Sequence, residues 1–214
     1  MNNILIVTAV DAERDAILRG LNELKPFDVI AVGVGSAAAA AGTAKALSEK
    51  KYDLVVCAGI GGGFTEHTKA GDLVIADEII AADLGSETKD GFLSVEDTRI
   101  GYSRCAVDQP LLKRLQGRLQ ESGIAFVSGP IITVSTATGT AETADILAKR
   151  VTGACAEGME GFGAACAAKL FGVPCIEMRA ISNEVGPRDR DSWRISEALE
   201  ILTKGMAAIQ EVLI

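Results

Sequence analysis

The stretch from Glu157 to Pro187 reads EGMEGFGAACAAKLFGVPCIEMRAISNEVGP, an apolar helix-like segment followed by an apolar strand-like segment. It places Glu160 at the start of the expected helix, and Arg179 and Asn183 toward the far end of the expected strand. A carboxylate, a guanidinium and an amide are costly to bury unless each has a partner. These three side chains therefore either satisfy one another or wait for a ligand.

Outward from this stretch, strand-like and helix-like segments alternate along the chain. We expect strands over residues 4–8, 29–32, 53–58, 73–81, 124–128, 131–135, 154–156 and 175–181. We expect helices over residues 11–21, 36–47, 110–121, 140–150, 159–170 and 191–212, and a loop over 83–97. The alternation predicts an α/β fold with a mainly parallel sheet covered by helices on both faces. No linker or internal repeat interrupts it, so residues 1–214 are expected to form one domain.

Composition and charge exclude several functional classes. Hydrophobic residues make up 48% of the chain, which a disordered protein does not have. The net charge of −8 argues against a nucleic-acid partner, which needs a clustered basic face. The first apolar run has no basic flank and is followed by Asp11, so we expect no signal peptide, no membrane partner and a cytoplasmic location.

The cysteine and histidine content predicts no metal site. The five cysteines are scattered and make no CxxC pair, and His67 is the single histidine. A structural zinc site or a histidine-based catalytic triad therefore has little to build on. The cysteines are expected to be small buried hydrophobic residues in a reducing compartment.

Two glycine-rich segments follow expected strands, where ligands bind in α/β folds. GVGSAA (Gly33–Ala38) fits the dinucleotide fingerprint GxGxxA, but the next strand ends in Ala58-Gly59 and lacks the acidic residue of that motif. AGIGGGF (Ala58–Phe64) is either a flexible connection or a place where backbone approaches a ligand closely. A phosphate-binding P-loop is excluded, because no Lys-Ser or Lys-Thr follows.

Six motifs occur in an order that carries a family resemblance: TAVDAERDAI, GVGSAAAAA, CAGIGGGF, GDLVIADEI, EGMEG and RAISN. The series resembles the nucleoside phosphorylase/nucleosidase family, in particular its methylthioadenosine/S-adenosylhomocysteine nucleosidases, over most of the chain. Arg179–Ile195 and Ala81–Thr88 are similar to the futalosine hydrolase branch, which serves an alternative menaquinone pathway. The resemblance implies a three-layer αβα fold around a twisted, mostly parallel mixed sheet, and a homo-oligomer without a cofactor.

The same resemblance implies an enzyme that cleaves the N-glycosidic bond of a small nucleoside through a ribocation-like transition state. Glu13 would act as general base on the attacking water, which Arg179 would help to orient. Glu160 would accept hydrogen bonds from the ribose hydroxyls, Met159 would pack on the sugar, and Asn183 would bind the N7 edge of the purine. Further substrate contacts are implied at Gly158, Ile60, Gly61, Gly62, Ser182 and Arg188.

Asn183 departs from the adenine-cleaving members of the family, which carry Asp at this position. An amide can donate to the O6 of a 6-oxopurine while its carbonyl accepts a proton from N7, whereas Asp would oppose O6 with a second acceptor. Asn183 therefore favours an inosine-like substrate such as futalosine, with release of hypoxanthine. Purine nucleoside phosphorylases also use Asn here, so the residue does not separate hydrolysis from phosphorolysis.

Other positions bear on the nucleophile and on the 5′ tail of the substrate. A phosphate ion would find Arg179 and few other donors, and Ile60 replaces a hydroxyl-bearing residue of many relatives, which favours water as nucleophile. The carboxylated tail of futalosine calls for an arginine, and Arg188, Arg190 and Arg194 follow Asn183 closely, with Trp193 among them. The alternatives are a purine nucleoside phosphorylase, an adenine nucleosidase, a nucleoside sensor without catalysis and, from GVGSAA alone, an NAD-dependent oxidoreductase.

Overall fold

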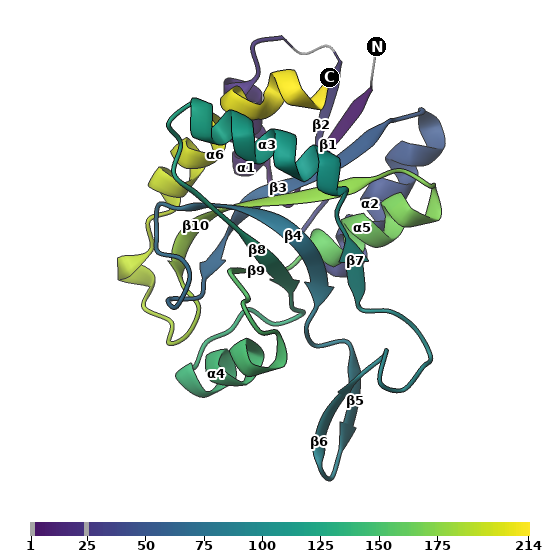
Figure 1. Cartoon of the computed structure of the whole chain (residues 1–214), viewed down its shortest axis with the longest axis vertical. Helices are drawn as coiled ribbons and strands as arrows, with labels where there is room; N and C mark the ends of the chain where they lie inside the picture. Colours follow the sequence, from purple (N-terminus) through teal and green to yellow (C-terminus); the bar gives the residue numbers. More distant parts are fainter. Residues whose placement is uncertain (1–2, 24–25) are drawn as a thin grey trace.

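The computed structural model describes residues 3–23 and 26–214, and it is an α/β structure built around one large sheet. The main strands are β1 (Ile4–Thr8), β2 (Phe27–Ala31), β3 (Leu54–Gly63), β4 (Leu73–Ala81), β7 (Arg104–Ala106), β8 (Phe126–Thr133), β9 (Ala156–Gly158) and β10 (Cys175–Glu184). The helices are α1 (Asp11–Gly20), α2 (Ser36–Glu49), α3 (Gln109–Glu121), α4 (Ala141–Arg150), α5 (Gly161–Leu170) and α6 (Ile195–Leu213). A two-stranded hairpin of β5 (Gly85–Thr88) and β6 (Gly91–Ser94) projects from the body (Figure 1).

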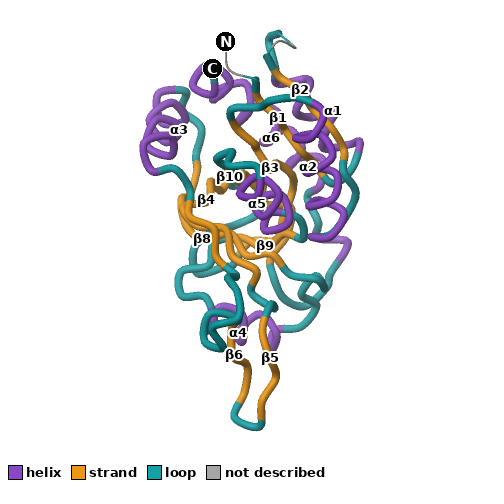
Figure 2. Tube along the Cα trace, turned by 90° about the vertical axis from the view of Figure 1, so that its right-hand side faces the viewer, coloured by secondary structure: helices purple, strands orange, loops and turns teal. Residues whose placement is uncertain are grey.

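The large sheet runs in the order β10-β4-β8-β9-β3-β1-β2, and β7 pairs with β4. An additional parallel pairing of β10 with β3 joins the two ends of the path from β10 to β3, so five strands close into a ring. The pairs β10–β4, β3–β9 and β4–β7 are antiparallel, and the remaining pairs of this sheet are parallel. The strong curvature of the strands is visible in Figure 2. The expected mixed, mostly parallel sheet is confirmed.

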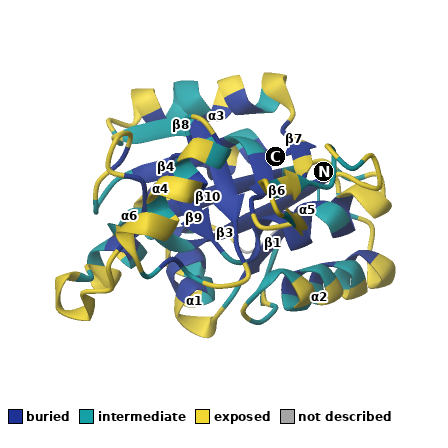
Figure 3. Cartoon of the chain, turned by 90° about the horizontal axis from the view of Figure 1, so that it is seen from below, coloured by how far each residue is buried: buried dark blue, intermediate teal, exposed yellow. Residues whose placement is uncertain are grey.

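Helices flank this sheet in two groups. Helix α6 packs against α1 and α3, while α2 packs against α5. The strands between them are largely buried: all five residues of β1 are buried, and β4 buries seven of its nine. Seen from below, the strands form the buried centre and the outer surface of α2 is exposed (Figure 3). Within the described residues, no helix is long and apolar enough to span a membrane.

Most expected elements are present, and several differ in their bounds. Strand β3 continues through Gly63 because its glycines pair with β10, across a register shift between Ile181 and Asn183, a contact that a glycine-rich sequence does not signal. Residues 126–133 form one strand instead of two, with Pro130 next to a register shift against β4. The hairpin β5–β6 replaces part of the expected loop over 83–97, strand β7 is an additional strand, and α6 begins at Ile195, after a short 3-10 turn.

Candidate active site

A cavity of about 370 Å³ opens at the ends of β1, β3, β9 and β10. Ten of the eleven residues expected at the site line it: Glu13, Ile60, Gly61, Gly62, Gly158, Met159, Glu160, Ser182, Asn183 and Arg188. Arg179 lies beneath it. The carboxyl ends of β1, β3 and β10 meet here because these three strands run parallel. A larger surface hollow of about 800 Å³ lies along β2 and α2, and none of the expected site residues lines it.

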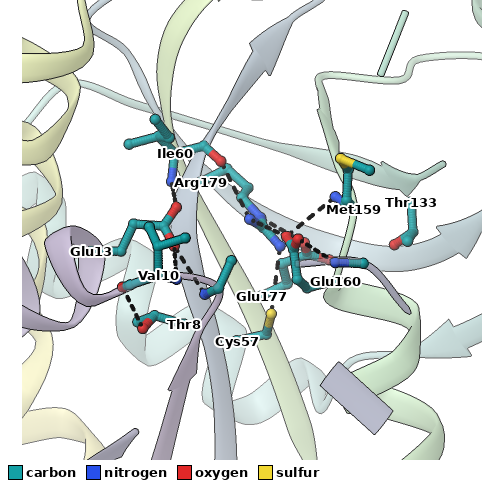
Figure 4. Close-up of polar contacts among 12 residues, drawn as sticks. Thr8, Val10, Glu13, Cys57, Ile60, Thr133, Met159, Glu160, Glu177 and Arg179 are labelled. Carbon is teal, nitrogen blue, oxygen red and sulfur yellow. Dashed lines mark hydrogen bonds and ion pairs between the residues drawn. The ribbon is translucent and has the colours of Figure 1, made fainter. Parts of the chain in front are cut away.

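Glu13 lies in the first turn of α1, and its carboxylate is fixed by backbone donors. Its Oε2 accepts hydrogen bonds from the N–H groups of Ala9 (2.9 Å) and Val10 (3.2 Å), and its Oε1 accepts one from the N–H of Ile60 (2.8 Å). The side chain bridges the end of β1 to the glycine segment of β3 (Figure 4). With an exposed fraction of 4%, Glu13 is a buried acceptor at the wall of the cavity.

Arg179 is 2% exposed and lies under the cavity floor. Its Nε donates to Glu177 Oε1 at 2.8 Å, and its Nη1 donates to Glu160 Oε2 at 3.1 Å and to the carbonyl of Ile60 at 3.3 Å. Arg179 therefore forms buried ion pairs with both Glu160 and Glu177. Arg179 binds Glu160 but is not among the residues that line the cavity. Its expected role in orienting the attacking water stays a prediction.

Glu160 stands at the N-terminus of α5 and connects three parts of the fold. Its Oε1 accepts from the N–H of Gly35 at 3.0 Å, and its Oε2 accepts from Arg179 and from the N–H of Met159 (3.3 Å). The glycine turn of GVGSAA, with Gly35 at φ +94°, thus serves to hold this carboxylate. Glu160 therefore has hydrogen-bond partners within the protein, and it also lines the cavity.

Two glycines make this crowding possible. A Cβ on Gly59 would lie 2.5 Å from Glu13 Oε1 and 2.8 Å from Arg179 Nη1. A Cβ on Gly161 would overlap the Glu177 carboxylate. Burial raises the pKa of Glu177 to about 7, an effect that Arg179 opposes without outweighing it.

Asn183 is held so that both of its polar atoms keep free capacity. Its Oδ1 accepts from the Ser182 hydroxyl at 2.7 Å, and its Nδ2 donates to the carbonyl of Glu184 at 2.9 Å. An amide oxygen accepts two hydrogen bonds and an amide nitrogen donates two, so one acceptor and one donor position remain. The Ser182 hydroxyl also contacts the carbonyl of Gly61 at 3.2 Å, which ties the amide to β3.

Glu157, the first residue of the EGMEG motif, and Thr138 also line the cavity, although neither is among the expected site residues. Glu157 is 7% exposed, and its two carboxylate oxygens accept from the Thr138 N–H (2.8 Å) and from the Thr138 hydroxyl. Burial raises the pKa of Glu157, while the hydrogen bonds from Thr138 act in the opposite direction. The available signal was its spacing, because residues two apart in an extended segment face the same side and Glu157 precedes Met159 by two.

Of the three arginines that follow Asn183, Arg188 and Arg194 make different contacts. Arg188 and Trp193 line the cavity, with the guanidinium 5.2 Å from the indole ring centre. Arg194 instead forms an ion pair with Glu197 and donates to the carbonyl of Ala70. Of the described residues, Arg188 is the single arginine that lines the cavity, and it shares the lining with three carboxylates.

All five cysteines are free thiols, and three of them, Cys57, Cys105 and Cys155, are buried. Burial raises the pKa of Cys57 well above its usual value, as expected for a small apolar side chain beneath the site. Among the described residues, no group of histidine, cysteine and acidic side chains could hold a metal ion.

Comparison with known proteins gives consistent results. The family model described as "Phosphorylase superfamily" matches residues 19–214. A futalosine hydrolase of Streptomyces coelicolor is 46% identical, with 99% of this chain and 96% of that protein covered. A futalosine hydrolase of Acidothermus cellulolyticus is 45% identical, over 96% of this chain and 89% of that protein.

Solved structures share the fold at lower identity. The native structure of a futalosine hydrolase of Helicobacter pylori superposes with a TM-score of 0.82 at 20% identity, covering 99% of this chain and 97% of that one. A mutant nucleosidase of Helicobacter pylori, with 5′-methylthioadenosine in its active site, superposes with a TM-score of 0.83 at 21% identity, covering 100% and 98% of the two chains. The chain belongs to the phosphorylase superfamily and, within it, to the futalosine hydrolases.

Proposed function

We propose that this protein hydrolyses the N-glycosidic bond of futalosine and releases hypoxanthine. The observation that carries the proposal is the convergence of Glu13, Glu160 and Asn183 on one cavity from three distant parts of the chain. Cleavage requires an activated nucleophile, stabilisation of a positively charged sugar and a hydrogen-bonded leaving base. The three side chains supply one group for each requirement.

In this mechanism Glu13 accepts a proton from the attacking water. Three backbone N–H groups hold its carboxylate in one orientation, so it needs no rearrangement during the reaction. Glu160 accepts hydrogen bonds from the ribose hydroxyls and places negative charge near the developing cation. Arg179, bound to Glu160 from below, acts as a positioning residue for that carboxylate.

Asn183 stabilises the leaving hypoxanthine. Its remaining carbonyl lone pair accepts a hydrogen bond from the N7–H that forms when the leaving base takes up a proton from solvent, and its remaining N–H donates to O6. The amide orientation is set by the carbonyl of Glu184, which can only accept a hydrogen bond and so identifies Nδ2, leaving Oδ1 beside the Ser182 hydroxyl. The amide therefore matches a 6-oxopurine.

Water is the proposed nucleophile because the cavity is unfavourable for an anion. The described residues that line it include three carboxylates, Glu13, Glu157 and Glu160, and one arginine, Arg188. Phosphate would be repelled by the carboxylates, and the guanidinium of Arg179 is already bound to protein acceptors. Arg188, with Trp193 beside it, is proposed to contact the carboxylated tail of the substrate.

The test is release of free base from futalosine, inosine and 5′-methylthioadenosine, each with and without phosphate, followed by chromatography. Hypoxanthine released from futalosine without phosphate is the expected result. Strict dependence on phosphate would make the protein a phosphorylase, and adenine released from methylthioadenosine alone would make it an adenine nucleosidase. A Glu13→Gln preparation, purified identically, controls for contaminating nucleosidases of the expression host.

A further inference from the structure

Glu157 is a buried carboxylate in the cavity for which the mechanism above has no use. Its oxygens accept two hydrogen bonds, both from Thr138. A carboxylate offers about four acceptor positions, so each oxygen keeps one position for a ligand. Thr138 and Glu157 come from opposite sides of α4 in the sequence, and their contact forms one wall of the cavity.

The sheet register places Glu157 across the cavity from Asn183. Gly62 on β3 pairs with Glu157 on β9 and with Asn183 on β10. Directly paired residues project to the same face of a sheet, and adjacent strands lie about 4.8 Å apart, so the two backbone positions are roughly 10 Å apart. The two polar side chains therefore flank Gly62 on a shared face.

Gly62 lies between these two side chains on the shared face. A Cβ at this position would lie 2.8 Å from Val185 Cγ2 and 3.5 Å from Asn183 Nδ2, so the glycine lets Val185 and Asn183 pack closely over the strand. Gly62, Asn183, Val185 and Glu157 all line the cavity, which therefore has an amide and a carboxylate in its wall. A flat heterocycle whose edge carries hydrogen-bonding groups matches this pair of groups.

The chemistry of the two walls distinguishes purines. A 6-oxopurine presents N7, O6 and an N1–H donor along one edge, whereas adenine presents N7, an amino group and an unprotonated N1 acceptor. An ionised carboxylate accepts hydrogen bonds and donates none. It can bind the N1–H of hypoxanthine, and it opposes the N1 lone pair of adenine.

We propose that Glu157 is a specificity-determining residue that accepts the N1–H of a 6-oxopurine, opposite Asn183 at the N7–O6 side. This inference rests on the proposed function, which brings a purine into the cavity. Thr138 is the positioning residue for Glu157, because its N–H and hydroxyl hold the two carboxylate oxygens. Adenine would place its N1 lone pair against the Glu157 carboxylate. Two buried acceptors would then face each other without a hydrogen bond, so adenine should bind more weakly.

The experiment measures binding of hypoxanthine, 1-methylhypoxanthine and adenine to the wild-type protein and to Glu157→Gln by calorimetry. Hydrogen bonds to charged groups are strong, so Glu157→Gln should weaken hypoxanthine binding about 10- to 100-fold and change adenine binding far less. Methylation removes the N1–H donor, so 1-methylhypoxanthine should bind the wild-type protein about 10- to 100-fold more weakly than hypoxanthine does. In Glu157→Gln the affinities for hypoxanthine and 1-methylhypoxanthine should differ much less. Gln has nearly the size of Glu, so the difference between the two methylation penalties isolates the hydrogen bond from the steric effect.

Controls separate this inference from misfolding and from the proposed function. Glu66→Gln removes the same charge at an exposed position outside the cavity and should bind all three bases as the wild type does. The wild-type comparison of the two hypoxanthines needs no variant, so it holds even if Glu157→Gln does not fold. Equal affinity of the wild type for both hypoxanthines, or unchanged hypoxanthine affinity in folded Glu157→Gln, would overturn the role of Glu157. If the wild-type protein shows these base preferences but does not cleave futalosine, the proposed function is rejected and the role of Glu157 is not.

Discussion

Protein hydrogen-bond donors, most of them backbone N–H groups, hold the carboxylates of Glu13 and Glu160 in place. Glu13 accepts from three N–H groups, and Glu160 accepts from two N–H groups and one guanidinium. Fixed acceptors of this kind stabilise developing positive charge without reorganisation. The functional consequences of single substitutions follow from which of these contacts each one removes.

Replacement of Glu13 by Gln should lower kcat about 10²- to 10⁴-fold, because an amide cannot accept the proton of the attacking water. Its NH₂ group would also face a backbone N–H of Ile60 or of Ala9 and Val10, which should lower the free energy of unfolding by about 1–3 kcal/mol. Futalosine turnover, measured at a temperature where thermal unfolding shows the variant to be folded, checks this. Wild-type turnover would remove Glu13 as the base.

Replacement of Asn183 by Asp should reverse the base preference. The carboxylate would place an oxygen where Nδ2 now donates, opposite the O6 acceptor of hypoxanthine. We expect kcat/KM for inosine or futalosine to fall about tenfold or more relative to that for 5′-methylthioadenosine, as expected for loss of one hydrogen bond and gain of a repulsion. A variant that loses adenine nucleosides preferentially would contradict our interpretation of the purine edge.

At the scale of elements, the glycine segment of β3 decides how close α1 and β10 can approach. Gly59 is the position where the carboxylate of Glu13 and the guanidinium of Arg179 both come within 3 Å of a hypothetical Cβ. The strand is therefore both a sheet element and the spacer that sets the geometry of the site. Flexibility is a secondary property here, since these glycines lie in a paired strand.

Replacement of Gly59 by Ala should abolish most activity, since Glu13 or Arg179 must move, and should destabilise the fold by about 1–3 kcal/mol through overpacking. Gly117→Ala is the matched control, because no atom lies within 4 Å of a Cβ there and Ala is favoured over Gly in a helix by about 0.5–1 kcal/mol. Urea unfolding and turnover of both variants provide the measurement. Full activity in Gly59→Ala would show that the close approach is not required.

At the scale of the whole molecule, the buried acid Glu177 makes stability depend on pH. Its pKa is about 7 in the folded protein against an ordinary 4.5, so between these values the folded state binds a proton that the unfolded state has released. The free energy of unfolding contributed by this group therefore falls as pH rises from about 4.5 to about 7. Below that window the contribution is fully retained.

Replacement of Glu177 by Gln should flatten this pH dependence, because the amide does not titrate. Urea unfolding of wild type and variant at several pH values between about 4.5 and 8 gives the slopes, with the exposed Glu66→Gln as reference. The variant also loses the ion pair with Arg179, so its stability at a single pH is uninformative and the slope is the readout. Identical slopes in wild type and Glu177→Gln would show that Glu177 is not the titrating group.

Self-association is a further whole-molecule prediction. Val10 and Val34 line the cavity and are 43% and 57% exposed, so an apolar part of its rim lies open in the single chain. A second subunit that covers this rim would bury both side chains, as the homo-oligomer implied by the family resemblance would allow. Light scattering on the purified protein should give a multiple of the single-chain mass. The mass of one chain would contradict it.

Much of this protein is determined by its sequence. The alternation of apolar strands with helices predicts an α/β sheet, and residues 73–81 form a strand with the expected bounds. The ordered motifs predict the family, and ten of the eleven residues that the resemblance implies at the site line one cavity. The fold and the family are predictable because periodicity, turn residues and short motifs are local properties, which a one-dimensional pattern records.

Only the tertiary structure decides the contacts between distant segments. The pairing of β10 with β3 closes the ring of strands, places Arg179 under the floor and brings Asn183 and Glu157 to either side of Gly62. Thr138 meets Glu157 because β8 and β9 are neighbours in the sheet, although a helix separates them in the chain. The partner of a buried charged side chain depends on which distant segments the fold brings next to it. Neither hydrophobic periodicity nor motif spacing records which segments those are.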